Sequence, residues 1–256
     1  MIDLKTKQEI ETMKTGGKIL ADVLFEVLKN VKVGVSEIEL DQLAEKLILE
    51  KGGEPGFKKV EGYKHTICIS TNDVVVHGIP TNYRLKEKDV VGIDCGVYYG
   101  GFHTDMAQTI KVKSEKSKVK SEDEVDKFLE TGERAMWEGI KAAKVGQRVG
   151  DISKAIQGIV EEQGYSVVRS LIGHGVGKEL HEDPEVPGFL DGSISRTPLL
   201  EESMTIAVEV IYSMGKSDVI YSGSDGWTIK TKDGSLSGLF ERTIVISSEG
   251  SLILTK

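Results

Sequence analysis

The chain repeats part of its own pattern at an offset of 112 residues, and this repeat limits the folds open to it. Residues 31–34, Val-Lys-Val-Gly, correspond to residues 143–146, Ala-Lys-Val-Gly. Apolar residues then recur in both copies at i, i+4, i+7 and i+8, the spacing of one helix face. Gly52 and Gly164 follow these segments, where a helix would end. Two helical hairpins could match through periodicity alone, but the shared Lys-Val-Gly and the shared glycine favour duplication into two similar halves.

Each half opens with helices and then changes to a strand pattern. The expected strands span residues 66–70, 74–76, 90–99 and 102–112, and in the second half residues 166–172, 204–212, 227–230 and 240–246. Helices followed by mostly antiparallel strands, twice over, predict an α+β fold with helices packed on one face of a curved sheet. No linker separates the halves, so we expect a single domain, residues 1–256, with internal repeats at about 16–111 and 128–246.

Composition argues against several classes of protein. The 256 residues carry a net charge of −8, which disfavours a nucleic-acid-binding surface. A basic run at residues 113–120 is interrupted by Glu115 and followed by three acidic residues, so we interpret it as a solvated loop. Cys68 and Cys95 fit a reducing compartment without a disulfide framework. With no apolar leader and no stretch long enough to span a bilayer, the chain is expected to be cytoplasmic and independent of membranes.

Five polar residues stand in Gly-rich turns or in apolar, β-branched runs, where a rigid scaffold would hold them. They are Asp94, Asp105, His174, Glu209 and Glu241. Carboxylate oxygens with one imidazole suit Mn, Fe, Co or Zn better than a thiolate site would. Two such ions bridged by carboxylates can bind and activate a water for hydrolysis. The set therefore indicates a metal-dependent hydrolase.

Spacing brings the two aspartates together. Gly100-Gly101, between two strand-like runs, is a signal for a two-residue hairpin turn. With the turn there, Asp105 faces Gly96 and Asp94 lies two residues further along the same face, so both carboxylates can reach metals roughly 3.5–4 Å apart. A one-residue slip would place them on opposite faces. A single aspartate usually caps a turn, but that explanation is harder to sustain for two on one face.

The histidine and the two glutamates each have a plainer alternative. His174 lies in Gly173-His-Gly-Val-Gly177, where the glycines would leave the imidazole accessible, yet an ordinary surface histidine in a loop is also open. Glu209 and Glu241 lie within or beside β-branched strands, where a buried carboxylate needs a partner. Either glutamate could instead be a charge that keeps an edge strand soluble.

Together these segments resemble methionine aminopeptidase of type I, the bacterial-like form. The resemblance rests on Asn72-Asp-Val-Val-Val-His-Gly-Ile-Pro80, Asp94 with Phe102-His-Thr-Asp105, Gly173-His-Gly-Val-Gly177 with His181-Glu-Asp-Pro184, and the strands of Glu209 and Glu241. It runs from about residue 5 to the C-terminus. It implies the pita-bread fold, two pseudo-symmetric halves around a dinuclear metal site, which agrees with the repeat. The helical insertion that marks type II is absent from the sequence.

The resemblance also implies how two divalent ions would be held. Asp94 would bind one ion, and Asp105 and Glu241 would bridge both. His174 and Glu209 would complete the shell of the second ion. The bridging water would be the nucleophile, and Glu209 would carry its proton to the leaving amine.

The same resemblance implies a substrate site for the N-termini of nascent polypeptides. His77 and His181 would hydrogen-bond the substrate near the scissile peptide and stabilise the tetrahedral intermediate. Tyr63, Cys68 and Trp227 would line the methionine pocket, although an ordinary core residue is the alternative at each position. The expected substrate has methionine first and a small second residue. The chain is expected to act as a monomer, and a transient ribosome contact is compatible with this role.

Five positions depart from the family pattern. Val210 and Arg242 follow the two glutamates, where proline and histidine are usual. Leu180 stands where an aromatic residue is common, and Phe57 and Val60 stand where the pocket's small or aromatic residues are expected. None of these changes removes an expected ligand. They bear on the shape of the pocket, on metal preference and on rate.

Three other functions remain open. An Xaa-Pro peptidase of the same fold would share all five ligands, but such enzymes usually carry a preceding domain and this chain starts at the first helix. A non-catalytic relative that binds partners or nucleic acid would have lost ligands and gained basic surface, whereas this chain keeps all five and is acidic. A metal-dependent hydrolase acting on something other than peptides would fit the same ligands.

Overall fold

The structure is a computed structural model that describes residues 2–113, 123–223 and 225–256. Apart from Lys113, the basic run at residues 113–120 lies outside this described part. Two groups of helices and strands follow one another along the chain, in the order that the sequence predicts.

The helices come in two pairs with matching turns. They are α1 (Lys7–Lys29), α2 (Glu37–Glu50), α3 (Glu124–Ala142) and α4 (Val149–Glu162). The bounds of α2 and α4 differ by the 112-residue offset of the sequence repeat. Gly34 and Gly146 precede them with φ of +87° and +82°, and Gly52 and Gly164 follow them with φ of +78° and +81°. These left-handed conformations favour glycine, so both helices are preceded and followed by backbone turns of the same kind.

The strands form two sheets in which all pairings are antiparallel. They are β1 (Glu54–Pro55), β2 (Ile67–Thr71), β3 (Val74–Val76), β4 (Val90–Tyr99), β5 (Phe102–Lys111), β6 (Ser166–Val167), β7 (Gly173–Gly175), β8 (Glu182–Val186), β9 (Thr205–Ser213), β10 (Val219–Tyr221), β11 (Ile229–Thr231), β12 (Ser237–Ser247) and β13 (Gly250–Ile253). The main sheet runs β1-β4-β5-β12-β9-β7-β8, and β2, β6 and β13 pair with β4, β9 and β12. A second sheet runs β10-β11-β3. The predicted α+β class is confirmed.

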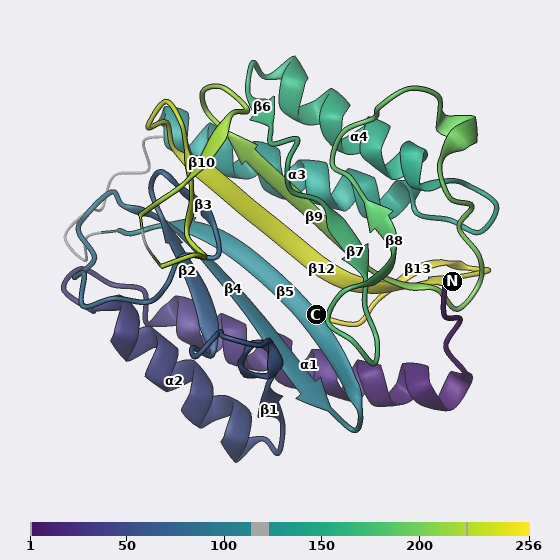
Figure 1. Cartoon of the computed structure of the whole chain (residues 1–256), viewed down its shortest axis with the longest axis horizontal. Coiled ribbons are helices and arrows are strands. Elements are labelled where there is room, and N and C mark those ends of the chain that lie inside the picture. Colours follow the sequence, from purple (N-terminus) through teal and green to yellow (C-terminus); the bar gives the residue numbers. More distant parts are fainter. Residues whose placement is uncertain (1, 114–122, 224) are drawn as a thin grey trace.

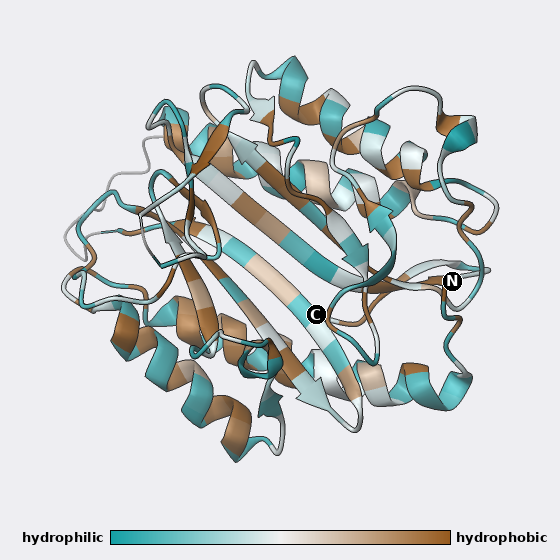
Figure 2. Cartoon of the chain, in the orientation of Figure 1, coloured by the Kyte–Doolittle hydropathy of each residue, from teal (hydrophilic) through white to brown (hydrophobic). Residues whose placement is uncertain are grey.

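Figure 1 shows α1 beside β4 and β5, with α2 next to β1 and β2. In the other half, α3 lies beside β9 and β12, with α4 next to β6 and β8. Strands β3 and β10 lie in front of the sheet in the same view. Hydrophobic and hydrophilic residues alternate along each helix, as expected for helices with one face on a core (Figure 2). Within the described residues, no helix has the length and apolar character needed to cross a membrane.

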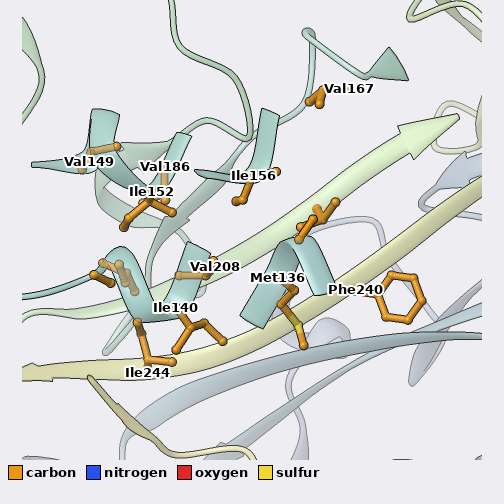
Figure 3. Close-up of a cluster of buried hydrophobic side chains, with 14 of the residues drawn as sticks. Met136, Ile140, Val149, Ile152, Ile156, Val167, Val186, Val208, Phe240 and Ile244 are labelled. Carbon is orange, nitrogen blue, oxygen red and sulfur yellow. The ribbon is translucent and has the colours of Figure 1, made fainter. Parts of the chain in front are cut away.

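Each half has its own hydrophobic core. Under α3 and α4, Met136, Ile152 and Val208 pack together in a cluster that also includes Phe240 and Ile244 of β12 (Figure 3). A separate cluster under α1 and α2 joins these helices to β2, β4 and β5. Burying apolar side chains on the helix side leaves the opposite face of the main sheet free to carry polar groups.

The two halves meet where β5 lies beside β12, and two threonine hydroxyls connect the strands there. Thr243 Oγ1 accepts the amide of Asp105 at 2.9 Å and donates to the Asp105 carbonyl at 2.8 Å. Thr109 Oγ1 does the same for Leu239, at 2.9 Å and 2.7 Å. Each hydroxyl satisfies both backbone groups of the residue opposite, so it takes the place of two ladder hydrogen bonds.

The strand prediction was wrong in one segment and incomplete in others. Residues 166–172 were expected to form one strand, but only Ser166–Val167 pair, with β9. Strands β1, β7, β8, β10 and β13 were not expected. Strand β7 is Gly-His-Gly, and β8 contains Pro184, so neither has the β-branched composition on which the prediction relied.

Replacing Thr243 by valine removes the hydroxyl while keeping the shape of the side chain. The buried amide and carbonyl of Asp105 then lose their partner, so the free energy of unfolding should fall by ~2–5 kcal/mol. Urea unfolding of the protein in the presence of a chelator measures this. Thr243→Ser keeps the hydroxyl and is the control. If the valine and serine variants were equally stable, the hydroxyl would not join the halves as described.

Candidate metal centre and substrate pocket

All ten residues that the sequence singles out line one cavity of about 190 Å³. They are Asp94, Asp105, His174, Glu209, Glu241, His77, His181, Tyr63, Cys68 and Trp227. A larger hollow of about 850 Å³ lies over α3 and β13, but none of the ten lines it. The residues with a predicted chemical role therefore gather in the smaller cavity, which both halves of the chain help to form.

The β4–β5 hairpin brings the two aspartates together in the predicted register. Its turn residues, Gly100 and Gly101, have φ of +58° and +94°, as a two-residue turn of this kind requires. Asp105 pairs with Gly96, two residues from Asp94, so both carboxylates project from the same face of the sheet. This part of the sequence-based model is confirmed.

The two glutamates face each other from the other half. Glu209 of β9 pairs in register with Glu241 of β12. Both strands lie inside the main sheet, between β5 and β7, so the alternative that these glutamates are edge-strand charges is wrong. Asp105 and Glu241 are 4% and 3% exposed. Ligand atoms of Asp105, His174 and Glu241 all lie within 4.8 Å of one another, a group that could hold a metal ion.

His174 lies in strand β7, not in the loop that the flanking glycines suggested. Its Nδ1 lies 2.8 Å from the carbonyl oxygen of Gly175. Because a carbonyl can only accept, Nδ1 carries the proton and Nε2 presents its lone pair. Nε2 lies 3.9 Å from a carboxylate oxygen of Glu209. Burial lowers the pKa of His174 to about 4, with the charge of His181 contributing, so the imidazole is neutral and suited to bind a metal.

Four carboxylates share this buried space. Burial raises the pKa of Asp94 to about 7, and burial together with the charge of Asp94 raises the pKa of Glu209 to about 8. Burial and the neighbouring carboxylates hold the pKa of Asp105 and of Glu241 well above the usual range. Oδ1 of Asp94 and Oε1 of Glu241 are buried and find no hydrogen-bond partner among the described residues. Buried oxygens of like charge need a cation, so these residues fit a divalent metal centre.

Two further histidines reach the cavity from opposite halves. His77 follows β3 with φ of +55°, a conformation that residues other than glycine rarely adopt. A Cβ on Gly78 would lie 1.9 Å from a β2 carbonyl oxygen, so only glycine fits beside it. The His181 ring comes from the β7–β8 segment and lies 4.4 Å from the His174 ring, centroid to centroid. Unlike His174, His181 is exposed at the mouth of the cavity.

One wall of the cavity is apolar. Phe57, Tyr63, Cys68 and Leu180 form a buried cluster against which Trp227 packs. The Tyr63 hydroxyl donates to a β2 carbonyl at 2.8 Å, and its ring meets the Trp227 ring edge-on at 5.1 Å. Burial, with the nearby carboxylates, raises the pKa of the Cys68 thiol, so it stays protonated and unsuited to bind a metal.

Sequence reasoning missed some of the cavity wall. Leu171, Ile172, Val76, Ile211 and Leu239 also line it. In the sequence these apolar residues look like ordinary core residues. Only the folded structure shows that they face a cavity. The pair Leu171-Ile172, directly before Gly173-His174, gave the best available signal and was interpreted as part of a strand.

Val210 and Arg242 lie on the other side of the sheet from the two glutamates. Val210 belongs to the core under α3 and α4. The Arg242 guanidinium donates to the Ala107 carbonyl at 3.0 Å and to Gln108 Oε1 at 2.7 Å, and it lies 5.7 Å from the Trp137 ring. Neither side chain lines the cavity, so these two departures from the family pattern change the face of the sheet opposite the cavity.

The stability that a metal confers should depend on pH. The folded pKa values of the four carboxyl groups are raised, so their contribution to the stability of the metal-free fold is fully present below the unfolded carboxyl pKa of about 4 and is lost as pH rises through about 7 to 8. A cation binds the ionised groups and offsets this loss. The difference in Tm between Mn-loaded and chelated protein should therefore grow between about pH 6 and pH 9. Asp94→Asn removes one of these carboxyl groups, so the Tm of the chelated variant should change less with pH. A Tm of the chelated wild-type protein that did not depend on pH would contradict the prediction.

The model of metallopeptidase family M24 matches residues 11–248 of the chain. A methionine aminopeptidase of Clostridium perfringens is 42% identical over 255 residues, which cover 100% of this chain and 99% of that protein. The crystal structure of methionine aminopeptidase from Thermotoga maritima matches with a TM-score of 0.93 and 39% identity, over 100% of both chains. Prolidase from Pyrococcus furiosus matches with a TM-score of 0.74 and 25% identity, over 99% of this chain and 65% of its own.

These likenesses confirm the predicted pita-bread fold. They also favour a methionine aminopeptidase over an Xaa-Pro peptidase, because the match to methionine aminopeptidases extends over the whole of both chains. The prolidase has a further third of its chain outside the shared fold. The chain belongs to metallopeptidase family M24 and, within it, to the methionine aminopeptidases.

Proposed function

We propose that this aminopeptidase removes the N-terminal methionine of nascent polypeptides whose second residue is small. The observation that carries the proposal is that a carboxylate–imidazole cluster, two histidines and an apolar wall with a sulfur and aromatic rings all line one small cavity. Each part has a separate task in such a reaction: to hold cations, to bind the scissile peptide and to bind the thioether side chain.

Two divalent ions would occupy the cluster, with Co, Mn, Fe and Zn as candidates. Asp94 would hold one ion and His174 and Glu209 the other, with Asp105 and Glu241 between them. The unpartnered oxygens of Asp94 and Glu241 and the free lone pair on His174 Nε2 support this arrangement. Oxygen donors with one imidazole suit these metals. When bound, such ions supply Lewis acidity and an activated water.

Glu209 would act as the proton carrier. Its carboxylate lies 3.9 Å from His174 Nε2 and also lines the cavity in which the peptide would lie. A carboxylate in this place can accept a proton on one oxygen and return it to the leaving amine.

His77 and His181 would donate hydrogen bonds to the peptide. Partial burial of the His77 ring and of the His181 ring lowers the pKa of both imidazoles, so each is neutral and has one N–H to donate. His77 is fixed by its strained backbone, whereas His181 stands at the exposed mouth of the cavity. A donor aimed at the developing oxyanion stabilises the transition state more than the ground state.

The apolar wall would select methionine. Tyr63, Cys68 and Trp227 offer aromatic edges and a thiol, which suit a flexible thioether. The cavity of about 190 Å³ holds both this wall and the cluster, so little room is left for a bulky second residue.

Other expectations remain proposals of the same kind. We propose one domain over residues 1–256 with repeats at about 16–111 and 128–246, supported by the matching bounds of α2 and α4. A monomeric state, a cytoplasmic location and a transient ribosome contact complete the proposal, with no nucleic-acid partner.

Purified protein should release free methionine from Met-Ala-Ser only with a divalent metal, and a chelator should stop the reaction. Asp105→Ala and Glu241→Ala should each abolish release, because a water cannot replace the charge of a bridging carboxylate. Glu11→Ala, at an exposed carboxylate on α1, is the control. Chromatographic detection of methionine measures the rate. Faster cleavage of Xaa-Pro peptides than of Met-Ala-Ser would overturn the proposed function.

His181→Ala should lower kcat by about 10²–10³-fold, the cost of losing one transition-state hydrogen bond. Metal content, measured by elemental analysis, should be unchanged because His181 lies outside the proposed ligand set. A variant that lost its metal along with its activity would make His181 a ligand instead.

A further inference from the structure

The N-terminal arm, residues 2–6, runs along the segment that carries His181. Lys5 donates its backbone amide to Ser203 at 3.0 Å. Its side chain is 1% exposed, and Nζ lies 2.7 Å from Glu182 Oε2 and 3.3 Å from Asp3 Oδ2. A lysine is almost never so buried unless it is paired, so the ammonium and the Glu182 carboxylate depend on each other. Figure 1 shows the N-terminus close to β8.

The carboxylate that Lys5 holds also orders the turn between β7 and β8. Glu182 Oε1 accepts the amide of Glu179 at 3.2 Å, and Gly177 donates its amide to the Glu179 carbonyl at 3.0 Å. Glu182 itself pairs with Gly175. The side chain of Glu182 thus holds the Glu179 end of the segment in which His181 lies, and its backbone pairing with Gly175 holds the other end.

The fit of Lys5 against this segment is close. A Cβ on Gly177 would lie 2.4 Å from Lys5 Cε and 2.7 Å from its Nζ, so the lysine stem occupies the space that a side chain would need. Lys178 adds weaker contacts, 3.9 Å to Asp3 and 3.8 Å to Glu9. The segment therefore lies against the arm on one side, and His181 projects from it into the cavity.

We propose that Lys5 is a positioning residue for His181. By neutralising and holding Glu182, Lys5 fixes the backbone of the residue before it, His181, and so the direction from which the His181 imidazole reaches the peptide. This inference rests on the role proposed above for His181. Lys5 does not line the cavity and touches no reacting atom.

A positioning role requires that contacts of the neighbouring residues restrain the backbone of His181. His181 is exposed at the mouth of the cavity, and its ring meets the His174 ring edge-on, 4.4 Å from centroid to centroid. A second restraint comes through the neighbouring Glu182, whose ion pair with the buried Lys5 ammonium limits the positions that the His181 backbone can take. A small displacement of a hydrogen-bond donor reduces a rate by a large factor, because the donor must match the transition state.

The test is a double-mutant cycle on metal-loaded protein with Met-Ala-Ser. Lys5→Met should lower kcat about tenfold or more, with metal content unchanged. In the His181→Ala background, Lys5→Met should lower kcat by less than about twofold, because the residue through which it acts is gone. Glu182→Gln, which keeps the shape and removes the ion pair, should show the same dependence on His181.

Lys111→Met is the matched control. Lys111 is 11% exposed and pairs with Asp123 at 2.9 Å and Asp126 at 2.7 Å, away from the cavity. Its loss should leave kcat unchanged. If Lys5→Met does not fold, the Glu182→Gln arm of the cycle gives the answer.

The outcomes separate this inference from the proposed function. If Lys5→Met and Glu182→Gln lower kcat by equal factors with and without His181, or leave kcat unchanged, Lys5 acts on stability alone and the positioning role is wrong. If the wild-type protein releases no methionine, or His181→Ala leaves kcat unchanged, the proposed function fails and this inference falls with it.

Discussion

The rest of the structure depends on how the chain keeps four carboxylates and one imidazole in a single buried space. Asp105 and Glu241 are almost fully buried, and ionised groups so close together repel strongly once water is removed. Their raised pKa values express this cost. A site of this kind weakens the metal-free fold at neutral pH. It is tolerated because two hydrophobic cores, one in each half, hold the sheet from the other side.

The scaffold also has to hold the two halves at a fixed separation, because each contributes carboxylates to the cluster. The direct ladder between β5 and β12 is short. Thr109 and Thr243 extend it on either side, with one hydroxyl from each strand. A hydroxyl placed between two strands is a wider spacer than a backbone hydrogen bond, so the strands can diverge here without leaving backbone groups unpaired. Two uncharged side chains thus help to hold the halves together beside the cluster.

The sequence predicts those parts of the fold that depend on local periodicity. The β4–β5 register follows from two turn glycines and an alternation of two, which is why Asp94 and Asp105 were placed correctly. The segment at residues 166–172 was misassigned because Leu171 and Ile172 are apolar in order to line a cavity, not to pair in a sheet. The contact between Lys5 and Glu182 joins residues 177 positions apart, and no local pattern encodes it. Periodicity in the sequence predicts which residues share one face of a helix or strand. Contacts between distant segments can be identified only in the folded structure.

The positions of Val210 and Arg242 show how the site and its support are divided between the two faces of one strand pair. Side chains alternate across a strand, so the residue after each glutamate faces away from the cavity. Val210 adds to the helix-side core, and Arg242 binds backbone and side-chain oxygens of β5. Changes at these positions act on strand spacing and on core packing, without removing a donor from the cluster. A departure from the family pattern next to a proposed ligand therefore changes the packing that supports the ligand-bearing strand. A departure at Phe57 or Leu180, which line the cavity, changes instead what the pocket can bind.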